Sequence, residues 1–228
     1  MYLFILTLIV YVSSLTLIKP APSSLKSCQN YSYSDNFKRV WASIFSGALI
    51  ILVFFLTTNF GFISIDENLY KTLALKNNMA LFLDWPAQLV SHLFIHGNLI
   101  HLVSNVVGLG MASVYERRVG AKRYFSVLLI GSLASIPSVL FYSENVFIGG
   151  ISGGVFGLAA AYFTDEKDLT LKEWLLAIAL FLVLAALLAF DSENKINSQD
   201  ELNIQIDHIG HFLGALGAIL YCRFVPLR

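Results

Sequence analysis

The sequence predicts an all-α membrane protein, a bundle of six membrane-spanning helices preceded by an extra N-terminal transmembrane helix. Hydrophobic residues make up 57% of the 228 residues, charged residues only 13%, and the mean hydropathy is +0.70, outside the range of soluble proteins. The apolar residues gather in long runs. Because backbone amides cannot stay unpaired in hydrocarbon, a run of about 20 such residues is expected to form a helix that crosses the bilayer.

Six runs have the length and hydropathy expected of spans. They cover approximately residues 40–63, 98–115, 124–142, 150–164, 173–190 and 205–222. The fourth and sixth are less apolar because they carry glycines, a serine and histidines, as expected of helices that line a polar cavity. Together the runs define one six-helix domain over residues 40–225.

The segments before this domain are of two kinds. Residues 1–19 hold an apolar run that is either an extra transmembrane helix or a signal-like segment. This run has no Lys or Arg before it and several after it, which favours a retained helix over a cleaved signal. Residues 20–39 are polar and are expected to form a linker, and the connection of residues 64–97 is expected to lie at the membrane interface.

Lys and Arg are distributed unevenly between the two sides of the predicted bundle. If the segment before residue 40 is cytoplasmic, the cytoplasmic side collects Lys38, Arg39, Arg117, Arg118, Lys122, Arg123, Lys167, Lys172, Arg223 and Arg228. The other side holds only Lys71, Lys76 and Lys195. The positive-inside rule therefore predicts that the second, fourth and sixth spans begin at the extracytoplasmic face. We expect a multi-pass protein of the plasma (inner) membrane with its active site open to that face.

Composition argues against several other classes of function. The formal net charge is zero, so no nucleic-acid partner is indicated. Cys28 and Cys222 are the only cysteines and lie far apart, which supports neither a disulfide framework nor a thiolate metal site. We expect the lipid bilayer as a partner, and no nucleic acid, metal or cofactor.

All five histidines fall in two clusters. They are His92, His96 and His101 near the start of the second span, and His208 and His211 in the sixth. Ionisable side chains at bilayer depth are costly and are therefore functional candidates. His101 and Asn105 are four residues apart, so both lie on one helix face. The alternative is a polar pair that satisfies itself inside the bundle, and His92 is most simply an interfacial residue.

Ser152 lies in a glycine-rich stretch at the start of the fourth span, Gly149-Gly150-Ile151-Ser152-Gly153-Gly154. Small neighbours leave room for a substrate backbone, and free amides at a helix start can stabilise an oxyanion. The letters also match the G-x-S-x-G elbow of α/β-hydrolases, but that elbow needs a strand and a soluble sheet. Taken alone, the stretch favours glycine packing over catalysis.

The fourth and sixth spans carry small residues at spacings that allow close helix packing. The pairs are Gly153 with Gly157 and Gly210 with Gly214. A serine hydroxyl becomes a useful nucleophile only when a base takes its proton, and histidine can do so near neutral pH. The sixth span has no acid at depth except Asp207 at its outer end, so the sequence indicates a Ser–His dyad. His208 remains an alternative to His211.

Four motifs, in this order, resemble those of the rhomboid family of intramembrane serine proteases. Residues 96–105 (HGNLIHLVSN) resemble HxxxxHxxxN, 115–120 (YERRVG) the Glu-x-Arg-x-Gly loop, 150–153 (GISG) the GxSG motif, and 207–214 (DHIGHFLG) the stretch with the catalytic histidine. Order and spacing agree over about residues 85–222. Glu116 and Arg118 of the second motif are most simply a structural pair on the cytoplasmic side.

The resemblance implies a six-helix bundle around a water-filled cavity open to the outer side. By residue-for-residue carry-over, Ser152 is the expected nucleophile and His211 the expected base. His101, Asn105 and the Ser152 amide are the expected oxyanion hole. Residues expected to support the site are His96, Gly150, Gly153, Gly214 and Phe156. Phe156 stands where the family commonly has a tyrosine, and it keeps a ring for packing under the histidine.

The resulting hypothesis is an intramembrane serine endopeptidase that cleaves the transmembrane segments of single-pass membrane proteins. The alternative is a catalytically silent rhomboid-like protein that binds transmembrane helices for quality control or trafficking. Such relatives usually lack the serine or the histidine, and this sequence has both. A histidine-lined metal or proton carrier needs acidic partners at membrane depth, and neither these nor an HExxH motif occur in the sequence.

Overall fold

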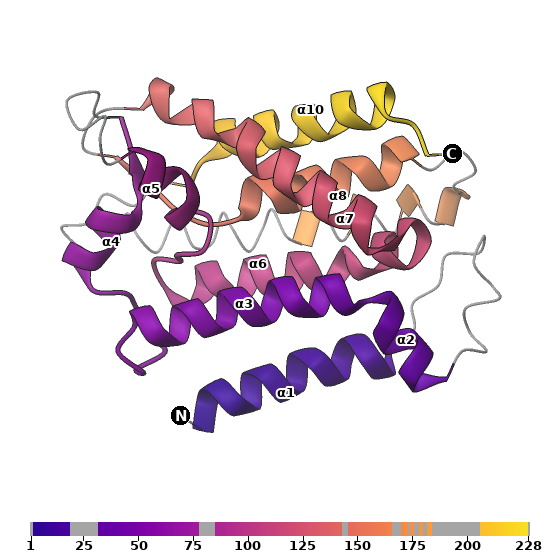
Figure 1. The fold of residues 1–228 in the computed structure, drawn as a ribbon, viewed down its shortest axis with the longest axis horizontal. Helices are drawn as coiled ribbons and strands as arrows, with labels where there is room; N and C mark the ends of the chain where they lie inside the picture. The colour runs from indigo at the N-terminus through magenta and orange to yellow at the C-terminus, as the bar shows by residue number, and fades with distance from the viewer. Residues whose placement is uncertain are drawn as a thin grey trace.

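Helices make up most of the described chain (Figure 1). This computed structural model describes residues 2–18, 32–77, 85–142, 146–165, 170–172, 174–175, 178–179, 182–183 and 206–227. Of the predicted span 173–190 it therefore describes only isolated residues, and that prediction lies largely outside the described chain.

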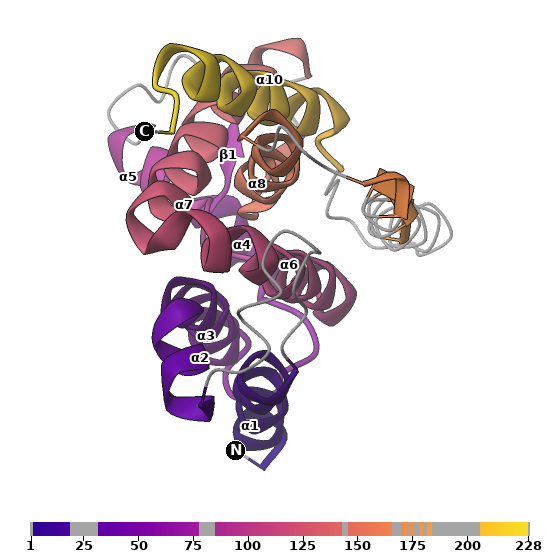
Figure 2. The ribbon, with the colours of Figure 1, turned by 90° about the vertical axis from the view of Figure 1, so that its right-hand side faces the viewer.

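The helices form two groups on either side of a central helix. They are α1 (Tyr2–Leu17), α2 (Tyr33–Arg39), α3 (Trp41–Thr57), α4 (Glu67–Leu73), α5 (Trp85–Ser91), α6 (Leu99–Met111), α7 (Ser113–Ser135), α8 (Ser152–Asp165) and α10 (His208–Phe224). Figure 2 shows α7, α8 and α10 on one side of α6, and α1, α2 and α3 on the other. The first group holds the candidate site.

Helices lie within the predicted runs 40–63, 98–115, 124–142, 150–164 and 205–222, but several ends differ. α3 stops at Thr57 because Asn59 and Phe60 turn the backbone with φ of 50° and 66°. α7 begins in the expected loop, and Gly120, with φ 79°, breaks it. A 3₁₀ turn over Ile136–Phe141, with Pro137 in its first turn, continues α7.

Length and composition alone identify few long spans among the described residues. The stretch Ser113–Phe141, 29 residues long, is long and apolar enough to cross a membrane, and α2 and α3, bent by 70°, qualify when taken together. α1 and α6 are shorter apolar helices. The chain thus carries the apolar helices expected of a membrane protein; α3 and α6 are shorter than the predicted runs, whereas α7 is longer.

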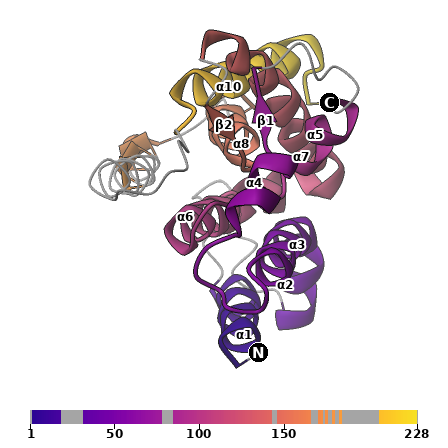
Figure 3. The same cartoon turned by 90° about the vertical axis from the view of Figure 1, so that its left-hand side faces the viewer.

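A small two-stranded sheet was not predicted. β1 (Leu75–Lys76) pairs with β2 (Phe147–Ile148) in antiparallel register, with Leu75 opposite Ile148 (Figure 3). These strands are too short to show a sequence period. The sheet ties the connection 64–97 to the residues that lead into Ser152, so the connection is partly packed inside the fold.

The polar segment 20–39 also contains structure that the sequence analysis did not predict. The Ser32 side chain caps α2 by accepting a hydrogen bond from the Asp35 amide at 3.1 Å. Asn36, in the middle of α2, donates from its side-chain amide to the carbonyls of Leu15 and Thr16 at 3.1 and 2.6 Å. The part of the expected linker that is described is therefore a helix attached to the end of α1.

A buried arginine completes the attachment of α1. Arg117 donates to the carbonyls of Leu15 and Ile18, both at 3.1 Å, and to the side-chain oxygen of Asn36 at 3.0 Å. The last carbonyls of a helix lack intrahelical partners and carry partial negative charge, so a cation here is favourable. At the other face, the Tyr11 hydroxyl donates to the Ser43 carbonyl at 2.7 Å.

Glu116 and Arg118, predicted as a structural pair, contact different helices. The Glu116 carboxylate accepts from the Ala42 and Ser43 amides, both at 2.8 Å, at the start of α3. Free amides at a helix N-terminus attract a carboxylate. The Arg118 guanidinium lies over the Tyr162 ring, 5.3 Å from its centroid.

We predict that Arg117→Ala loosens α1 and lowers the midpoint of thermal unfolding in detergent. Arg117 is only 5% exposed, and its loss leaves the Ile18 carbonyl and the buried Asn36 side-chain oxygen without this donor, at a cost of roughly 1–3 kcal/mol. Lys122→Ala, an exposed change on the same helix, is the control. Equal midpoints for the two variants would show that Arg117 does not hold α1.

Candidate active site

Backbone contact between glycines brings α7, α8 and α10 together. A methyl group added to Gly214 of α10 would overlap the Gly153 carbonyl of α8, and one added to Gly131 of α7 would lie 3.1 Å from that same oxygen. A methyl group added to Gly157 of α8 would lie 3.1 Å from the α-carbon of Gly131, so Gly157 belongs to the same contact. The sequence anticipated the glycines of α8 and α10 but not the contribution of α7.

At Gly210 the atoms nearest to an added methyl group belong to Asp207, not to α8 as expected. A methyl group at Gly210 would overlap the Asp207 carboxylate instead. Residues 207 and 210 belong to the same first helical turn, and the side chain of the first residue folds back over the turn to cap it. The two glycines therefore have different roles: Gly214 makes room for α8, and Gly210 makes room for the Asp207 carboxylate.

Ser152 and His211 meet across the α8–α10 contact. His211 Nε2 lies 2.8 Å from Ser152 Oγ, within hydrogen-bond distance. Ser152 is the first residue of α8, and His211 lies one turn into α10. The Phe156 ring stacks on the His211 ring, with centroids 4.3 Å apart and planes 9° apart. The hydrogen bond and the stacked ring together fix the imidazole.

The loop before Ser152 requires a glycine. Gly150 has φ of 111°, a left-handed conformation that side chains rarely adopt, and its amide donates to the His92 carbonyl at 2.6 Å. A methyl group on Gly150 would lie 2.8 Å from His101 Nε2. This close approach aims the His101 ring at the backbone that leads into Ser152.

Asn105 is buried on the same face of α6 as His101, and its side-chain hydrogen bond stays within that helix. Its side-chain amide donates to the His101 carbonyl at 3.0 Å, and it is only 2% exposed. Within the described chain its side-chain oxygen has no partner. Asn98 caps α6 by accepting from the His101 amide at 2.8 Å.

His96 and His92, the two remaining histidines of the first cluster, pack near the loop that precedes Ser152. His96 is fully buried, with its ring against that of His101 at 5.0 Å between centroids, and its Nδ1 donates to the Phe94 carbonyl at 3.2 Å. His92, expected at the interface, is also buried, because the loop of residues 149–150 covers it. Burial lowers the pKa of both rings to about 4, so both are neutral at physiological pH.

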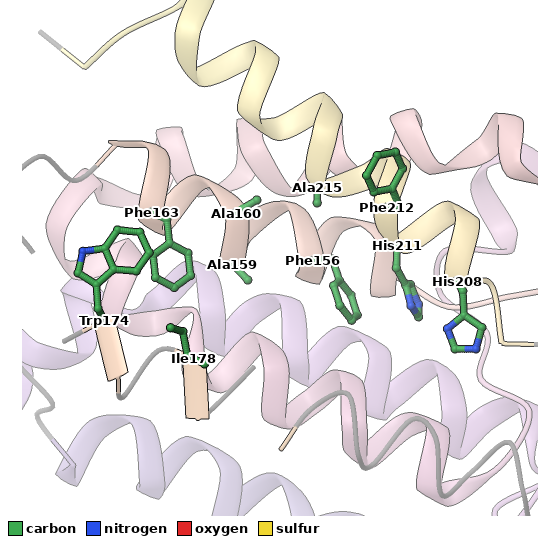
Figure 4. Close-up of a pocket in the computed structure, with 10 residues that line it drawn as sticks. All are labelled: Phe156, Ala159, Ala160, Phe163, Trp174, Ile178, His208, His211, Phe212 and Ala215. Atoms are coloured by element: carbon green, nitrogen blue, oxygen red, sulfur yellow. The ribbon is translucent and has the colours of Figure 1, made fainter. Parts of the chain in front are cut away.

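Two cavities reach the Ser–His pair. The larger, about 560 Å³, is lined by Phe156, Ala159, Ala160, Phe163, Trp174, Ile178, His208, His211, Phe212 and Ala215 (Figure 4). Its wall is mostly apolar. The smaller, about 10 Å³, has a polar wall that includes Ser138, Ser152, Asp207 and His211. That is about the volume one water molecule needs.

A metal ion requires histidine, cysteine or acidic side chains that converge on one point. In the described ranges no three His, Cys, Asp or Glu side chains gather as a metal site requires. His208 and His211 have ring centroids 6.1 Å apart, and the His211 ring is bonded to a hydroxyl.

Fold and site together define a helical protein with apolar helices and a Ser–His pair between two of them. The family model of the rhomboid domain matches residues 85–227, more than half of the chain. The chain therefore belongs to the rhomboid family and is an integral membrane protein. The family generally includes intramembrane serine proteases, although some members are inactive. No significant match was found among curated proteins or among solved structures.

We predict that Gly214→Ala separates α8 from α10. The added methyl group has no room at the Gly153 carbonyl, and overpacking of this kind costs roughly 1–3 kcal/mol. The midpoint of thermal unfolding in detergent is expected to fall. Gly110→Ala is the matched control, since its methyl group would make ordinary contacts at 3.5 Å with Leu15 and Tyr11. A midpoint for Gly214→Ala as high as that of the control contradicts the prediction.

Proposed function

We propose that this protein is an intramembrane serine endopeptidase in which Ser152 is the nucleophile and His211 the general base. The observation that carries the proposal is the 2.8 Å hydrogen bond between Ser152 Oγ and His211 Nε2, at a cavity wall. Family membership supports it, because serine proteases of this family act within the membrane.

The proposed reaction uses the pair twice. Ser152 Oγ attacks the scissile carbonyl carbon while His211 Nε2 takes the hydroxyl proton. His211 then gives this proton to the leaving amine, the C–N bond breaks, and an acyl-enzyme remains. Water, deprotonated by His211, hydrolyses the ester and restores Ser152. The stacked Phe156 ring holds the imidazole plane during both transfers.

The proposed oxyanion hole consists of the Ser152 amide, His101 and Asn105. The Ser152 amide is at the start of α8, where amides lack intrahelical acceptors. The His101 ring already approaches the loop at Gly150. The Asn105 side-chain amide carries two N–H groups; one donates to the His101 carbonyl, and the second supplies the proposed bond to the oxyanion.

The proposed substrates are transmembrane segments of single-pass membrane proteins, cut near the extracytoplasmic face of the plasma membrane. The larger cavity supports this, because its apolar wall of alanines and aromatic rings suits a lipid-soluble segment and includes His211. Hydrolysis needs an extended backbone, which hydrocarbon disfavours. Helix-breaking residues in the substrate, and a small residue before the scissile bond beside the glycines, are therefore expected to help.

Activity-based labelling tests the nucleophile and the base. We predict that Ser152→Ala abolishes fluorophosphonate labelling, and that Ser152→Ala and His211→Ala each lower cleavage of a model transmembrane substrate by at least about 10³-fold. His208→Ala is expected to lose far less. Ser126→Ala, which removes a hydroxyl that donates to the Lys122 carbonyl within α7, is expected to lose nothing. A wild type that neither labels nor cleaves would favour the silent rhomboid-like alternative, and activity lost to a chelator would favour a metal enzyme.

The ring stack has its own prediction. Phe156→Ala is expected to lower kcat by up to about tenfold, because a stacked aromatic pair contributes roughly 0.5–1.5 kcal/mol. Phe156→Tyr keeps the ring and is expected to retain kcat. Equal rates for the two variants would show that the ring does not hold His211.

A further inference from the structure

The carboxylate of Asp207 joins two elements next to the Ser–His pair. As the cap of α10 it accepts from the Gly210 amide at 2.7 Å. It also accepts from the Tyr142 hydroxyl at 3.1 Å and from the Ser138 hydroxyl. Ser138 and Tyr142 belong to the 3₁₀ turn that continues α7 and to its cap. One side chain thus binds the start of α10 to the end of α7.

This arrangement is unlike that of Asp66, the other aspartate that is the N-cap residue of a helix in the described chain. Asp66 caps α4 by accepting from the Leu69 amide at 3.0 Å, and that is the one side-chain hydrogen bond it makes there. Asp207 has the same local geometry with two added bonds to a different element. It also explains Gly210, because its carboxylate occupies the space of a side chain at that position. Capping alone does not require the two hydroxyl donors.

His211 is attached to this junction through the backbone. The His211 amide donates to the Asp207 carbonyl at 2.9 Å, so residue 207 closes the turn that carries the imidazole. Among the described residues, the carboxylate makes no hydrogen bond to the His211 ring, whose hydrogen-bond partner is Ser152. The effect of Asp207 on the ring therefore passes through the position of α10, not through a direct triad contact.

We propose that Asp207 is a positioning residue that sets the His211 to Ser152 distance by tying the first turn of α10 to residues 138–142. The proposal rests on the proposed function, in which His211 is the base. Proton transfer depends steeply on this distance, and a misplacement of about 1 Å can cost on the order of 10²-fold in rate. The contact between Gly153 and Gly214 holds α8 and α10 together. Asp207 fixes the first turn of α10, next to the Ser152–His211 pair.

Three variants separate the effects of three features of Asp207: its bonds to the Ser138 and Tyr142 hydroxyls (the tie), its bond to the Gly210 amide (the cap) and its negative charge. Asp207→Ala removes all three bonds. Asp207→Asn keeps an acceptor for the Gly210 amide and offers an amide to the hydroxyl oxygens, but removes the charge. Ser138→Ala combined with Tyr142→Phe keeps the cap and removes the tie. Asp66→Ala is the matched control for loss of a carboxylate cap far from α10.

The kinetic test compares kcat and KM for a model transmembrane substrate in detergent. We expect Asp207→Ala and the Ser138→Ala/Tyr142→Phe double variant to lower kcat by about 10- to 100-fold, with KM changed less than about threefold. Asp207→Asn is expected to recover most of kcat with the wild-type pH profile, and Asp66→Ala to match the wild type. Wild-type kcat in the double variant, or an Asp207→Asn as inactive as Asp207→Ala, overturns the proposal.

Hydrogen exchange provides a readout that does not depend on activity. We expect the amides of residues 210–212 to exchange at least about tenfold faster in Asp207→Ala and in the double variant than in the wild type, because the first turn of α10 loses its anchor. Unchanged exchange in the double variant overturns the proposal even if the wild type cleaves nothing. An inactive wild type with the expected exchange pattern refutes only the proposed protease.

Discussion

The rest of the site depends on the close approach of α8 and α10. Only glycine allows the carbonyl of Gly153 to touch the α-carbon of Gly214, and this contact sets the separation at which a serine and a histidine side chain can share a proton. Gly131 extends the same contact to α7. In hydrocarbon the apolar surface of a helix gains little from burial against another helix, so backbone packing carries more of the association than it would in water.

Polar side chains at helix ends supply the second layer of organisation. Glu116 caps α3, Arg117 neutralises the last carbonyls of α1, and Asp207 caps α10. Each is buried or partly buried, and each makes hydrogen bonds with backbone groups that have no partner within their own helix. All three also connect parts of the chain that are distant in sequence, so the same bonds that cap helix ends also hold the bundle together.

The match to the rhomboid domain covers residues 85–227, and α1, α2 and α3 lie before it. The bonds of Glu116 and Arg117 nevertheless link these three helices to the matched region. The N-terminal helices are thereby attached to α7, the helix that also contributes Gly131 to the site. α7 therefore joins the N-terminal helices to the site.

The sequence by itself determined the helical class and the family, because apolar runs and short motifs are local patterns. It did not determine the end of α3, the β1–β2 pairing or the burial of His92, since these depend on contacts between segments far apart in the chain. Tertiary structure also decided what Gly210 and Asp207 do. Spacing predicted a helix–helix contact at Gly210, yet a side chain folded back over its own turn occupies that space, and only the packed structure reveals the hydroxyl donors that hold it there.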